Sequence, residues 1–295
     1  MRAAVLGSPV GHSLSPALHT AAYAALGLAG EWDYTLHECR EEGLAAFLQG
    51  CGAEWAGLSL TMPLKREALR LADEVEPLAR EVGGANTVVF DRRGRRLAYN
   101  TDVHGIVAAL REAGVERASS AAVLGGGATA ASAVAALREL GATGDGAVTV
   151  WARDPKRTAG VAAAAERMQL GVATAPLERI EGRLDVDVVV STLPTGAGDA
   201  YAAPVVASGA ALFDVVYSPW PTVLASAAQE AGRTVVDGFA MLLHQAARQV
   251  ELMTGAEQAP VEAMRAAGLA ELRRRSAGGA AAEGAETGGS GALRE

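Results

Sequence analysis

The stretch "SAAVLGGGATAASAVAALREL", residues 120–140, joins an apolar run, three glycines and an alanine-rich amphipathic segment. This order is typical of a buried strand, a tight turn and a helix. Gly125, Gly127 and Ala130 have the spacing G-x-G-x-x-A, in which glycines let backbone N–H groups meet a pyrophosphate at the helix N-terminus. A chain rich in alanine and glycine also produces this spacing by chance, so a plain strand–helix turn is the alternative. The flanking strand and helix favour a dinucleotide-binding unit.

Apolar runs and helical patterns keep alternating on both sides of this turn. Runs such as "GAVTVWAR" and "DVDVVVST" are separated by segments such as "RTAGVAAAAERM". That alternation is typical of a doubly wound parallel sheet. We therefore expect residues 104–238 to form a Rossmann-type domain.

The residues after the second strand of this unit bear on the choice of dinucleotide. The apolar run ends at Ala152 and is followed by Arg153, Lys156 and Arg157. NAD sites commonly carry an acid here for the ribose 2′-hydroxyl, whereas guanidinium groups suit a 2′-phosphate. The sequence therefore favours NADP over NAD. A solvated cationic loop is the alternative, and Asp154 could instead contact a ribose hydroxyl.

The first third of the chain also alternates short strands and helices, which indicates a mostly parallel sheet covered by helices. Two strands around the turn "RRGR" are expected to form an antiparallel hairpin. We expect residues 1–103 to form a substrate-binding catalytic domain, joined by C-terminal amphipathic helices in residues 239–273. Residues 276–295 are rich in glycine, alanine and glutamate without an apolar period, and we expect a disordered tail.

Four polar clusters stand at predicted strand ends in the first domain. They are "SLS" (Ser13, Ser15), "TMPLK" (Thr61, Lys65), "GGANT" (Asn86) and "NTD" (Asn100, Asp102). Ligands of parallel sheets bind beyond the carboxyl ends of the strands, so these side chains can converge on one cleft. Hydroxyls and an amide suit a polyhydroxylated ligand, and a lysine beside a carboxylate can transfer a proton. Taken one at a time, these residues are explained equally well as a helix cap, a surface lysine or turn formers. The hypothesis of a shared ligand site therefore rests on their arrangement together.

With these clusters, the chain resembles the shikimate dehydrogenase family, and the resemblance covers roughly residues 3–260. The motifs that carry the resemblance are "GSPVGHSLSP", "LSLTMPLK", "GGANT", "NTDVHG" and "DGFAMLLHQAA", in the order of the family. The chain departs from the family pattern at Ser59, Ala85, Ala152 and Ser191, and its cofactor turn has "GGGAT" where the family usually has G-A-G-G-A. These departures affect the cofactor preference more than the reaction type.

The resemblance implies a role for each matching residue. Lys65 and Asp102 would form the catalytic pair that flanks the reacting oxygen. The substrate would be bound by Ser13 and Ser15 at its carboxylate, by Thr61, Asn86 and Gln245 at its ring hydroxyls, and by Tyr217. The cofactor would be bound by Gly125, Gly126, Gly127, Ala128 and Thr129 at the pyrophosphate, by Arg153 and Arg157 at the 2′-phosphate, and by the backbone of Val215 and Gly238 at the nicotinamide. His12 is expected to hold the turn rather than to carry a proton.

The activity that the resemblance implies is reversible, NADPH-dependent reduction of 3-dehydroshikimate to shikimate, in the biosynthesis of chorismate and aromatic amino acids. A quinate/shikimate dehydrogenase that uses NAD is one alternative. A non-catalytic sensor of a dinucleotide or a shikimate-like ligand is another, although the Lys65/Asp102 pair argues against it.

Composition limits the remaining classes of function. The 295 residues are 50% hydrophobic and 20% charged with a net charge of −8, which suits a globular protein without a nucleic-acid surface. Cys39 and Cys51 form no disulfide framework, and the histidines lack metal-ligand spacing, so we expect no metal. The residues after Met1 lack the pattern of a signal peptide, and no run of 18 or more uncharged apolar residues occurs, so we expect no transmembrane helix. We therefore expect a cytoplasmic monomer or homodimer that binds a small-molecule substrate and neither nucleic acid nor membrane.

Overall fold

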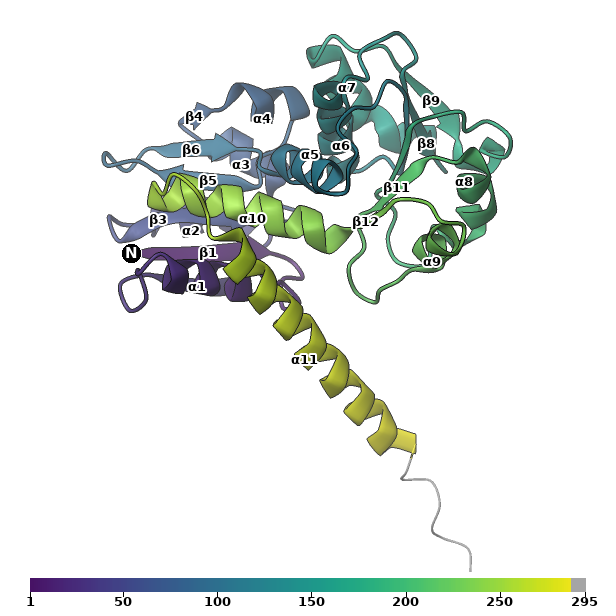
Figure 1. The fold of residues 1–295 in the computed structure, drawn as a ribbon. Coiled ribbons are helices and arrows are strands. Elements are labelled where there is room, and N and C mark those ends of the chain that lie inside the picture. Colours follow the sequence, from purple (N-terminus) through teal and green to yellow (C-terminus); the bar gives the residue numbers. More distant parts are fainter. Residues whose placement is uncertain (288–295) are drawn as a thin grey trace, which may run out of the picture.

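The computed structural model describes residues 1–287 and folds them into two α/β lobes (Figure 1). The first lobe holds a six-stranded sheet with the order β2-β1-β3-β5-β6-β4. Its strands are β1 (Arg2–Gly7), β2 (Asp33–Glu38), β3 (Trp55–Leu60), β4 (Glu74–Val75), β5 (Thr87–Phe90) and β6 (Arg96–Tyr99). β5 runs antiparallel to β3 and β6, and the other pairs are parallel. The mostly parallel sheet and its hairpin are confirmed.

Helices cover both faces of this sheet because its strands are apolar on both sides. Ala4 and Leu6 of β1 pack with the helices of one face, and Ala3 and Val5 pack with those of the other. The helices of the first face are α2 (Glu41–Gln49), α3 (Lys65–Leu71) and α4 (Pro77–Val82). Those of the second face are α1 (Ser15–Ala25) and α10 (Gly238–Thr254).

The second lobe is a six-stranded, fully parallel sheet with the order β12-β11-β10-β7-β8-β9. Its strands are β7 (Ala121–Leu124), β8 (Val148–Ala152), β9 (Val172–Pro176), β10 (Val188–Ser191), β11 (Ala211–Asp214) and β12 (Val235–Asp237). Its helices are α6 (Ala128–Leu140), α7 (Ala159–Arg167), α8 (Ala202–Ser208) and α9 (Val223–Glu230), with 3-10 turns η1 (Pro155–Thr158), η2 (Leu177–Arg179) and η3 (Asp199–Tyr201). The predicted Rossmann-type doubly wound fold is confirmed, and its switch point lies between β7 and β10.

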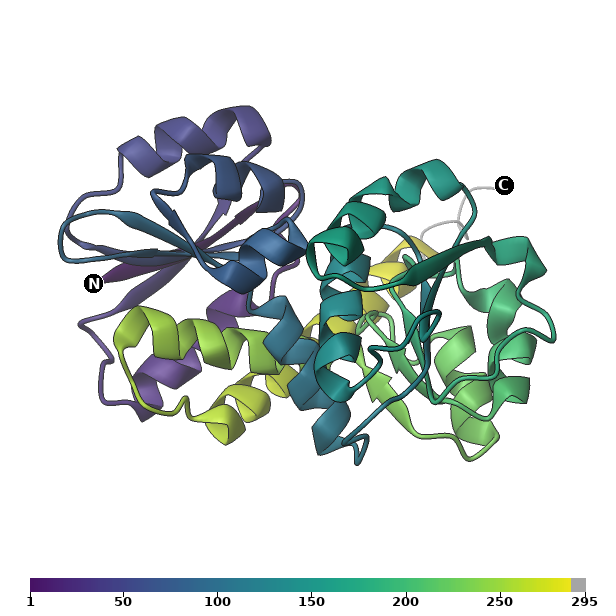
Figure 2. The ribbon, with the colours of Figure 1, turned by 90° about the horizontal axis from the view of Figure 1, so that it is seen from above.

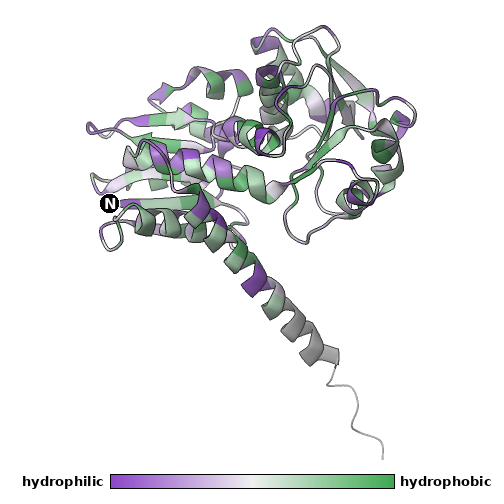
Figure 3. Cartoon of the chain, in the orientation of Figure 1, coloured by the Kyte–Doolittle hydropathy of each residue, from purple (hydrophilic) through white to green (hydrophobic). Residues whose placement is uncertain are grey.

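Hydrophobic residues concentrate along the strands of this sheet, as Figure 3 shows.

The strands β9 and β4 and the helix α8 are absent from our sequence prediction. β4 has two residues, β9 is an edge strand with small side chains, and α8 contains Pro204 near its start. None of the three carries enough apolar period to be recognised.

The chain crosses between the lobes twice. α5 (Asp102–Glu112) leads out of the first lobe, and α10 returns from β12 to lie alongside α5 and against β3 and β5, as Figures 1 and 2 both show. α4 adds polar contacts across the boundary. Arg138 of α6 pairs with Glu81 at 2.6 Å, and Arg167 of α7 donates to the Glu81 carbonyl at 2.9 Å.

The last helix, α11 (Val261–Thr287), packs on α1 and then extends from the body of the molecule (Figure 1). We expected disorder from residue 276, but the helix continues through Thr287, and residues 288–295 lie outside the described part. A helix that is already nucleated extends at little further cost, and alanine has the highest helix propensity. The disordered tail therefore stays a prediction.

A buried polar layer lies where α1, β2, β3 and α10 meet. His19 is 0% exposed, stacks on the Tyr34 ring at 4.0 Å, and has Nε2 3.3 Å from Gln249 Oε1. Ser59 accepts a hydrogen bond from Tyr34 and donates one to Gln249 Oε1, both at 2.7 Å. Burial lowers the pKa of His19 to about 3, so its imidazole is neutral at pH 7.

This histidine predicts a loss of stability in mild acid. The unfolded chain protonates His19 near its ordinary pKa of about 6.5, whereas the folded chain resists protonation until its pKa of about 3. The His19 contribution is therefore fully present above pH 6.5 and is lost as pH falls, by at most about 1.4 kcal/mol per pH unit. Urea unfolding at pH 7 and at pH 5 gives the fall in the free energy of unfolding between these two pH values. This fall should be about 2 kcal/mol smaller in His19→Gln than in wild type.

The exposed His12 provides the control, since His12→Gln should keep the wild-type pH dependence. An equal pH dependence of unfolding in wild type and His19→Gln would contradict the assignment.

Candidate active site

A cavity of about 340 Å³ lies between the lobes and is lined by residues from both. The predicted site residues that line it are Ser13, Ser15, Thr61, Lys65, Asn86, Asp102, Thr129, Val215, Tyr217, Gly238 and Gln245. The topology of the first sheet explains why they meet. Ser13, Thr61 and Asp102 follow the carboxyl ends of β1, β3 and β6, whereas Asn86 precedes β5. Because β5 is antiparallel, its start lies at the same sheet edge as the ends of β3 and β6.

Lys65 and Asp102 form an ion pair in the wall of this cavity. Lys65 Nζ lies 2.5 Å from Asp102 Oδ2, with side chains 17% and 7% exposed. Lys65 begins α3 and Asp102 begins α5, where the helix dipole favours a carboxylate. This arrangement holds an ammonium proton at a fixed place in the cavity wall, which is what a proton donor requires.

The Asn86 amide sits behind this pair and is 2% exposed. Its Nδ2 donates to Asp102 Oδ1 at 2.8 Å, Thr101 Oγ1 at 2.9 Å and Gln245 Oε1 at 3.1 Å. Its Oδ1 accepts from the Thr101 N–H at 2.8 Å and from Thr87 Oγ1 at 2.9 Å. Two amide hydrogens therefore already serve three protein acceptors, and the clearest role of Asn86 is to orient Asp102 and Gln245.

The loop of residues 7–16 forms another wall of the cavity. Ser13 Oγ accepts the N–H of Ser15 at 3.2 Å, and its own O–H donates to no acceptor within the described residues. Ser15 is the first residue of α1, and Pro16 lies in its first turn, where a missing N–H costs nothing. Gly7 allows this loop to pass Thr61, because a Cβ at position 7 would lie 2.2 Å from Thr61 Cγ2.

The His12 ring does not take the expected structural role. It lines the cavity, is exposed, and forms no hydrogen bond within the part of the chain that the structure describes. The loop is held there by backbone groups instead, including the Ser13 N–H, which donates to the Val10 carbonyl at 2.9 Å.

The second lobe presents a glycine turn to this boundary. Gly125 has φ +112° and its Cβ would lie 2.4 Å from Thr192 Oγ1, so the turn requires glycine there. Gly126 packs against the Arg157 carbonyl, with a Cβ position 3.0 Å away. Gly127 is the N-cap of α6, has open space around its Cβ position and offers no capping side chain. Ala128 and Thr129 follow in the first helical turn, so this cradle fits a pyrophosphate.

The cationic turn after β8 is also free to bind a phosphate. Arg153 and Arg157 are exposed, and neither guanidinium forms an ion pair or hydrogen bond within the described residues. Asp154 accepts the N–H of Lys156 at 3.0 Å and thereby caps η1. This contact uses Oδ1 only, so the alternative in which Asp154 contacts a ribose hydroxyl stays open.

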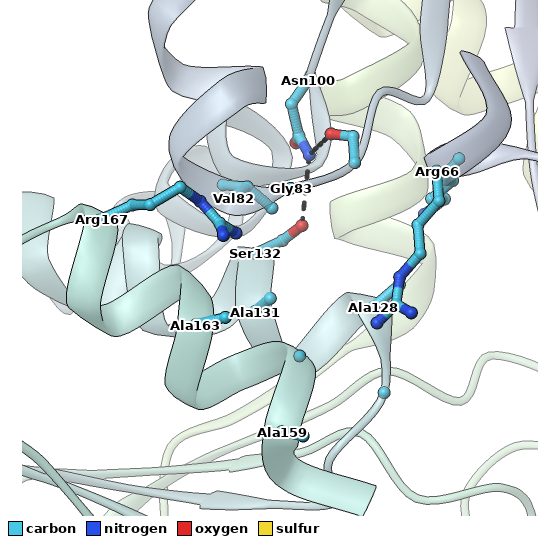
Figure 4. Close-up of a pocket in the computed structure, with 14 residues that line it drawn as sticks. Arg66, Val82, Gly83, Asn100, Ala128, Ala131, Ser132, Ala159, Ala163 and Arg167 are labelled. Atoms are coloured by element: carbon cyan, nitrogen blue, oxygen red, sulfur yellow. Dashed lines mark hydrogen bonds between the residues drawn. The ribbon is translucent and has the colours of Figure 1, made fainter. Parts of the chain in front are cut away.

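Figure 4 shows a second cavity, of about 390 Å³, on the other side of Lys65. It lies between α3 and α4 of the first lobe and α6 and α7 of the second, and Arg66 and Arg167 project into it. Asn100 belongs to this cavity, where its Nδ2 donates to the Gly84 carbonyl at 2.7 Å and to Ser132 Oγ at 3.5 Å. The predicted cluster "NTD" is therefore divided, because Asp102 faces the first cavity and Asn100 the second.

Two polar lining residues of the first cavity were not predicted from the sequence. Gln249 lies one helical turn after Gln245 on α10, and Ser59 lies two residues before Thr61 on β3. Helical i, i+4 spacing and strand i, i+2 spacing put each on the face of its predicted neighbour, and this signal could have identified them.

Metal-binding and membrane-spanning features are both missing from residues 1–287. This part of the chain holds no group of three or more His, Cys, Asp or Glu side chains arranged to bind a metal ion. The same residues contain no helix with the length and apolar character needed to span a membrane.

Comparison with known proteins places these features in a family. Residues 5–88 match the family described as shikimate dehydrogenase substrate binding domain, and residues 238–267 match shikimate 5′-dehydrogenase C-terminal domain. A shikimate dehydrogenase (NADP(+)) from Methanosarcina acetivorans is 39% identical over 281 residues, which cover 91% of this chain and 98% of the relative.

Solved structures agree with the sequence comparison. The shikimate dehydrogenase of Mycobacterium tuberculosis has a TM-score of 0.82 at 43% identity, covering 91% of this chain and 99% of that one. The shikimate 5-dehydrogenase of Thermus thermophilus, in complex with NADP(H) and shikimate, has a TM-score of 0.78 at 34% identity. That match covers 91% of this chain and 98% of the other.

The contact between Gly238 and Val215 gives a test of the cavity wall. A Cβ on Gly238 would lie 1.9 Å from the Val215 carbonyl oxygen, so Gly238→Ala must displace backbone. We expect Gly238→Ala to lower the free energy of unfolding in urea by about 1–3 kcal/mol, as overpacking does. Gly43→Ala in α2 is the control, because its Cβ would meet only Cys39 Sγ at 3.5 Å. Equal stability of the two variants would contradict the close contact.

Proposed function

Because this chain belongs to the shikimate dehydrogenase family, we propose that it catalyses the reversible NADPH-dependent reduction of 3-dehydroshikimate to shikimate. The observation that carries the proposal is the Lys65–Asp102 pair, which stands in a cavity bounded by the dinucleotide-binding lobe. The reaction supplies the biosynthesis of chorismate and aromatic amino acids. A relative that is 34% identical has been solved in complex with NADP(H) and shikimate, which supports the same ligands here.

When bound, NADPH would supply a hydride to the carbonyl carbon of the substrate. Lys65 Nζ gives its proton to the carbonyl oxygen, so that the carbonyl becomes a hydroxyl. Asp102 accepts a hydrogen bond from Lys65 and keeps the ammonium directed at the substrate oxygen. Asn86 fixes the carboxylate from behind through its bond to Asp102 Oδ1. In the oxidative direction, Lys65 Nζ takes the proton back.

The remaining lining residues bind and orient the ring. Ser13 and Ser15 hydrogen-bond the substrate carboxylate, next to the N-terminus of α1. Thr61 and Gln245 contact the ring hydroxyls, and Tyr217 closes the cavity from the second lobe. Asn86 contacts a hydroxyl by exchanging one of its three protein acceptors for the substrate.

NADP is the cofactor that the cationic turn favours. Arg153 and Arg157 bind the 2′-phosphate, Gly125 to Thr129 bind the pyrophosphate, and the backbone of Val215 and Gly238 lines the nicotinamide site. Initial rates with shikimate or quinate, each with NADP or NAD, test this assignment. A preference for quinate and NAD would favour the related quinate/shikimate dehydrogenase, and tight ligand binding without turnover would favour a sensor.

The proposal extends to the setting of the enzyme. It works in the cytoplasm as a monomer or homodimer, on small molecules alone, without a metal and without nucleic acid or membrane partners.

Replacement of Lys65 tests the proton transfer. Lys65→Met should lower kcat by about 10²–10⁴-fold because the proton donor is lost. Shikimate binding, measured by calorimetry, should be retained because the residues proposed to bind the ring and the carboxylate are unchanged. Arg66→Met is the matched control, since Arg66 is the next residue on α3 but faces the second cavity. Turnover of Lys65→Met close to wild type would remove Lys65 from the mechanism.

Replacement of Arg157 tests the cofactor assignment. Arg157→Ala should raise the KM for NADPH by about tenfold or more, because charge-assisted hydrogen bonds to a phosphate contribute about 1.5–3 kcal/mol. NADH lacks the 2′-phosphate and serves as the internal control, so its KM should not change. A parallel rise in both KM values would assign Arg157 to the fold of the turn instead.

A further inference from the structure

Arg275 of α11 reaches the substrate loop of residues 7–16 from the far end of the chain. Its Nη1 donates to the His12 carbonyl at 2.6 Å, and its Nη2 donates to the Ser13 carbonyl at 3.0 Å. Its Nε donates to Glu271 Oε1 at 2.7 Å, one helical turn earlier. One guanidinium thus binds two successive loop carbonyls while a carboxylate on its own helix holds it in place.

We propose that Arg275 is a positioning residue for the substrate carboxylate, acting through Ser13. The proposal rests on the proposed function, in which Ser13 and Ser15 bind that carboxylate. Arg275 lies beyond the residues that match the C-terminal family description, which end at residue 267, and none of the sequence motifs includes it.

The loop has few other anchors at this point. The Ser8 N–H donates to the Met62 carbonyl at 2.9 Å, and the Val10 N–H donates to Glu38 Oε2 at 3.2 Å. Both anchors precede the tip of the loop, residues 11–13. Within the described residues, Arg275 provides the hydrogen bonds that join the carbonyls of this tip to another element. If the loop already holds Ser13 in place, less conformational entropy is lost when a carboxylate binds to its hydroxyl.

The packing of α11 determines where Arg275 stands. Met264, Gly268 and Leu272 recur every four residues and face α1 and α10. A Cβ on Gly268 would lie 2.6 Å from the Phe239 ring, so this glycine lets the helix approach closely. Arg275 follows Leu272 by less than one helical turn, which places its guanidinium next to the loop.

The charge of Arg275 also acts at the cavity. Lys65, the other strong cation near the substrate, is already paired with Asp102. Burial raises the pKa of Tyr217, a cavity residue, and the positive charge of Arg275 opposes this rise. The single negative charge of Glu271 does not neutralise Arg275 fully, because Glu271 pairs with both Arg274 and Arg275. The end of the cavity with the serines therefore has a cation behind it, which suits an anionic group.

The test compares two neighbouring arginines. Arg275→Gln should raise the KM for shikimate by about tenfold, while kcat and the KM for NADP remain as in wild type. Arg274→Gln is the matched control, because Arg274 also binds Glu271 but its side chain is 72% exposed and, within the described residues, forms no hydrogen bond to the loop. Arg275→Lys keeps the positive charge but lacks the two guanidinium nitrogens that bind the two carbonyls. It should therefore give a KM for shikimate between those of wild type and Arg275→Gln.

Each outcome decides the proposal. A shikimate KM for Arg275→Gln equal to that of Arg274→Gln overturns it, and so does a lowered melting temperature without a change in KM. If Arg275→Gln does not fold, the comparison of Arg275→Lys with Arg274→Lys replaces it, and equal KM values overturn the proposal. Wild-type protein that does not oxidise shikimate at all would overturn the proposed function instead, so the two failures are distinguishable.

Discussion

The buried carboxamide of Asn86 is the interaction on which the active-site geometry depends. It connects the start of β5 and the turn that leads into α5, which lie 15 residues apart, with the middle of α10, 159 residues away in the chain. A buried polar group left without a partner costs about 1–3 kcal/mol, so a ligand group that displaces one of these contacts must supply a hydrogen bond in its place. Because Asp102 Oδ1 is one of them, the position of Lys65 depends in turn on the same amide.

Strand direction makes this connection possible. In a fully parallel sheet, the residue before a strand would lie at the edge opposite the residues that follow the other strands. β5 is antiparallel to β3 and β6, so Asn86 lies at the edge where Thr61 and Asp102 also lie. The return of α10 then brings Gln245 and Gln249 to the same place, and Gln249 continues the polar contacts to Ser59 and the buried His19. The residues proposed to bind the substrate and the core of the first lobe therefore share one hydrogen-bonded layer.

Most of the lining of the first cavity was predictable from the sequence, because those residues sit in motifs whose chemistry and strand-end position are local properties. Prediction failed where position depended on distant packing. Asn100 and Asp102 are two residues apart, yet Asn100 is drawn to Ser132 and the Gly84 carbonyl while Asp102 binds Lys65. The His12 ring was expected to hold a turn that backbone groups and Arg275 hold instead.

The sequence by itself determined the two-lobed α/β fold, the glycine turn before α6 and the lysine, carboxylate and hydroxyl groups of the site. Apolar period, glycine placement and side-chain chemistry are properties of short segments, and they are readable without knowing what lies opposite. Only the tertiary structure decided which polar side chains bind the Asn86 amide and which of the two cavities beside Lys65 each residue lines. It also decided that Arg275 reaches Ser13 across 262 positions of the chain. Those contacts follow from how helices pack on a sheet, and no local pattern records that packing.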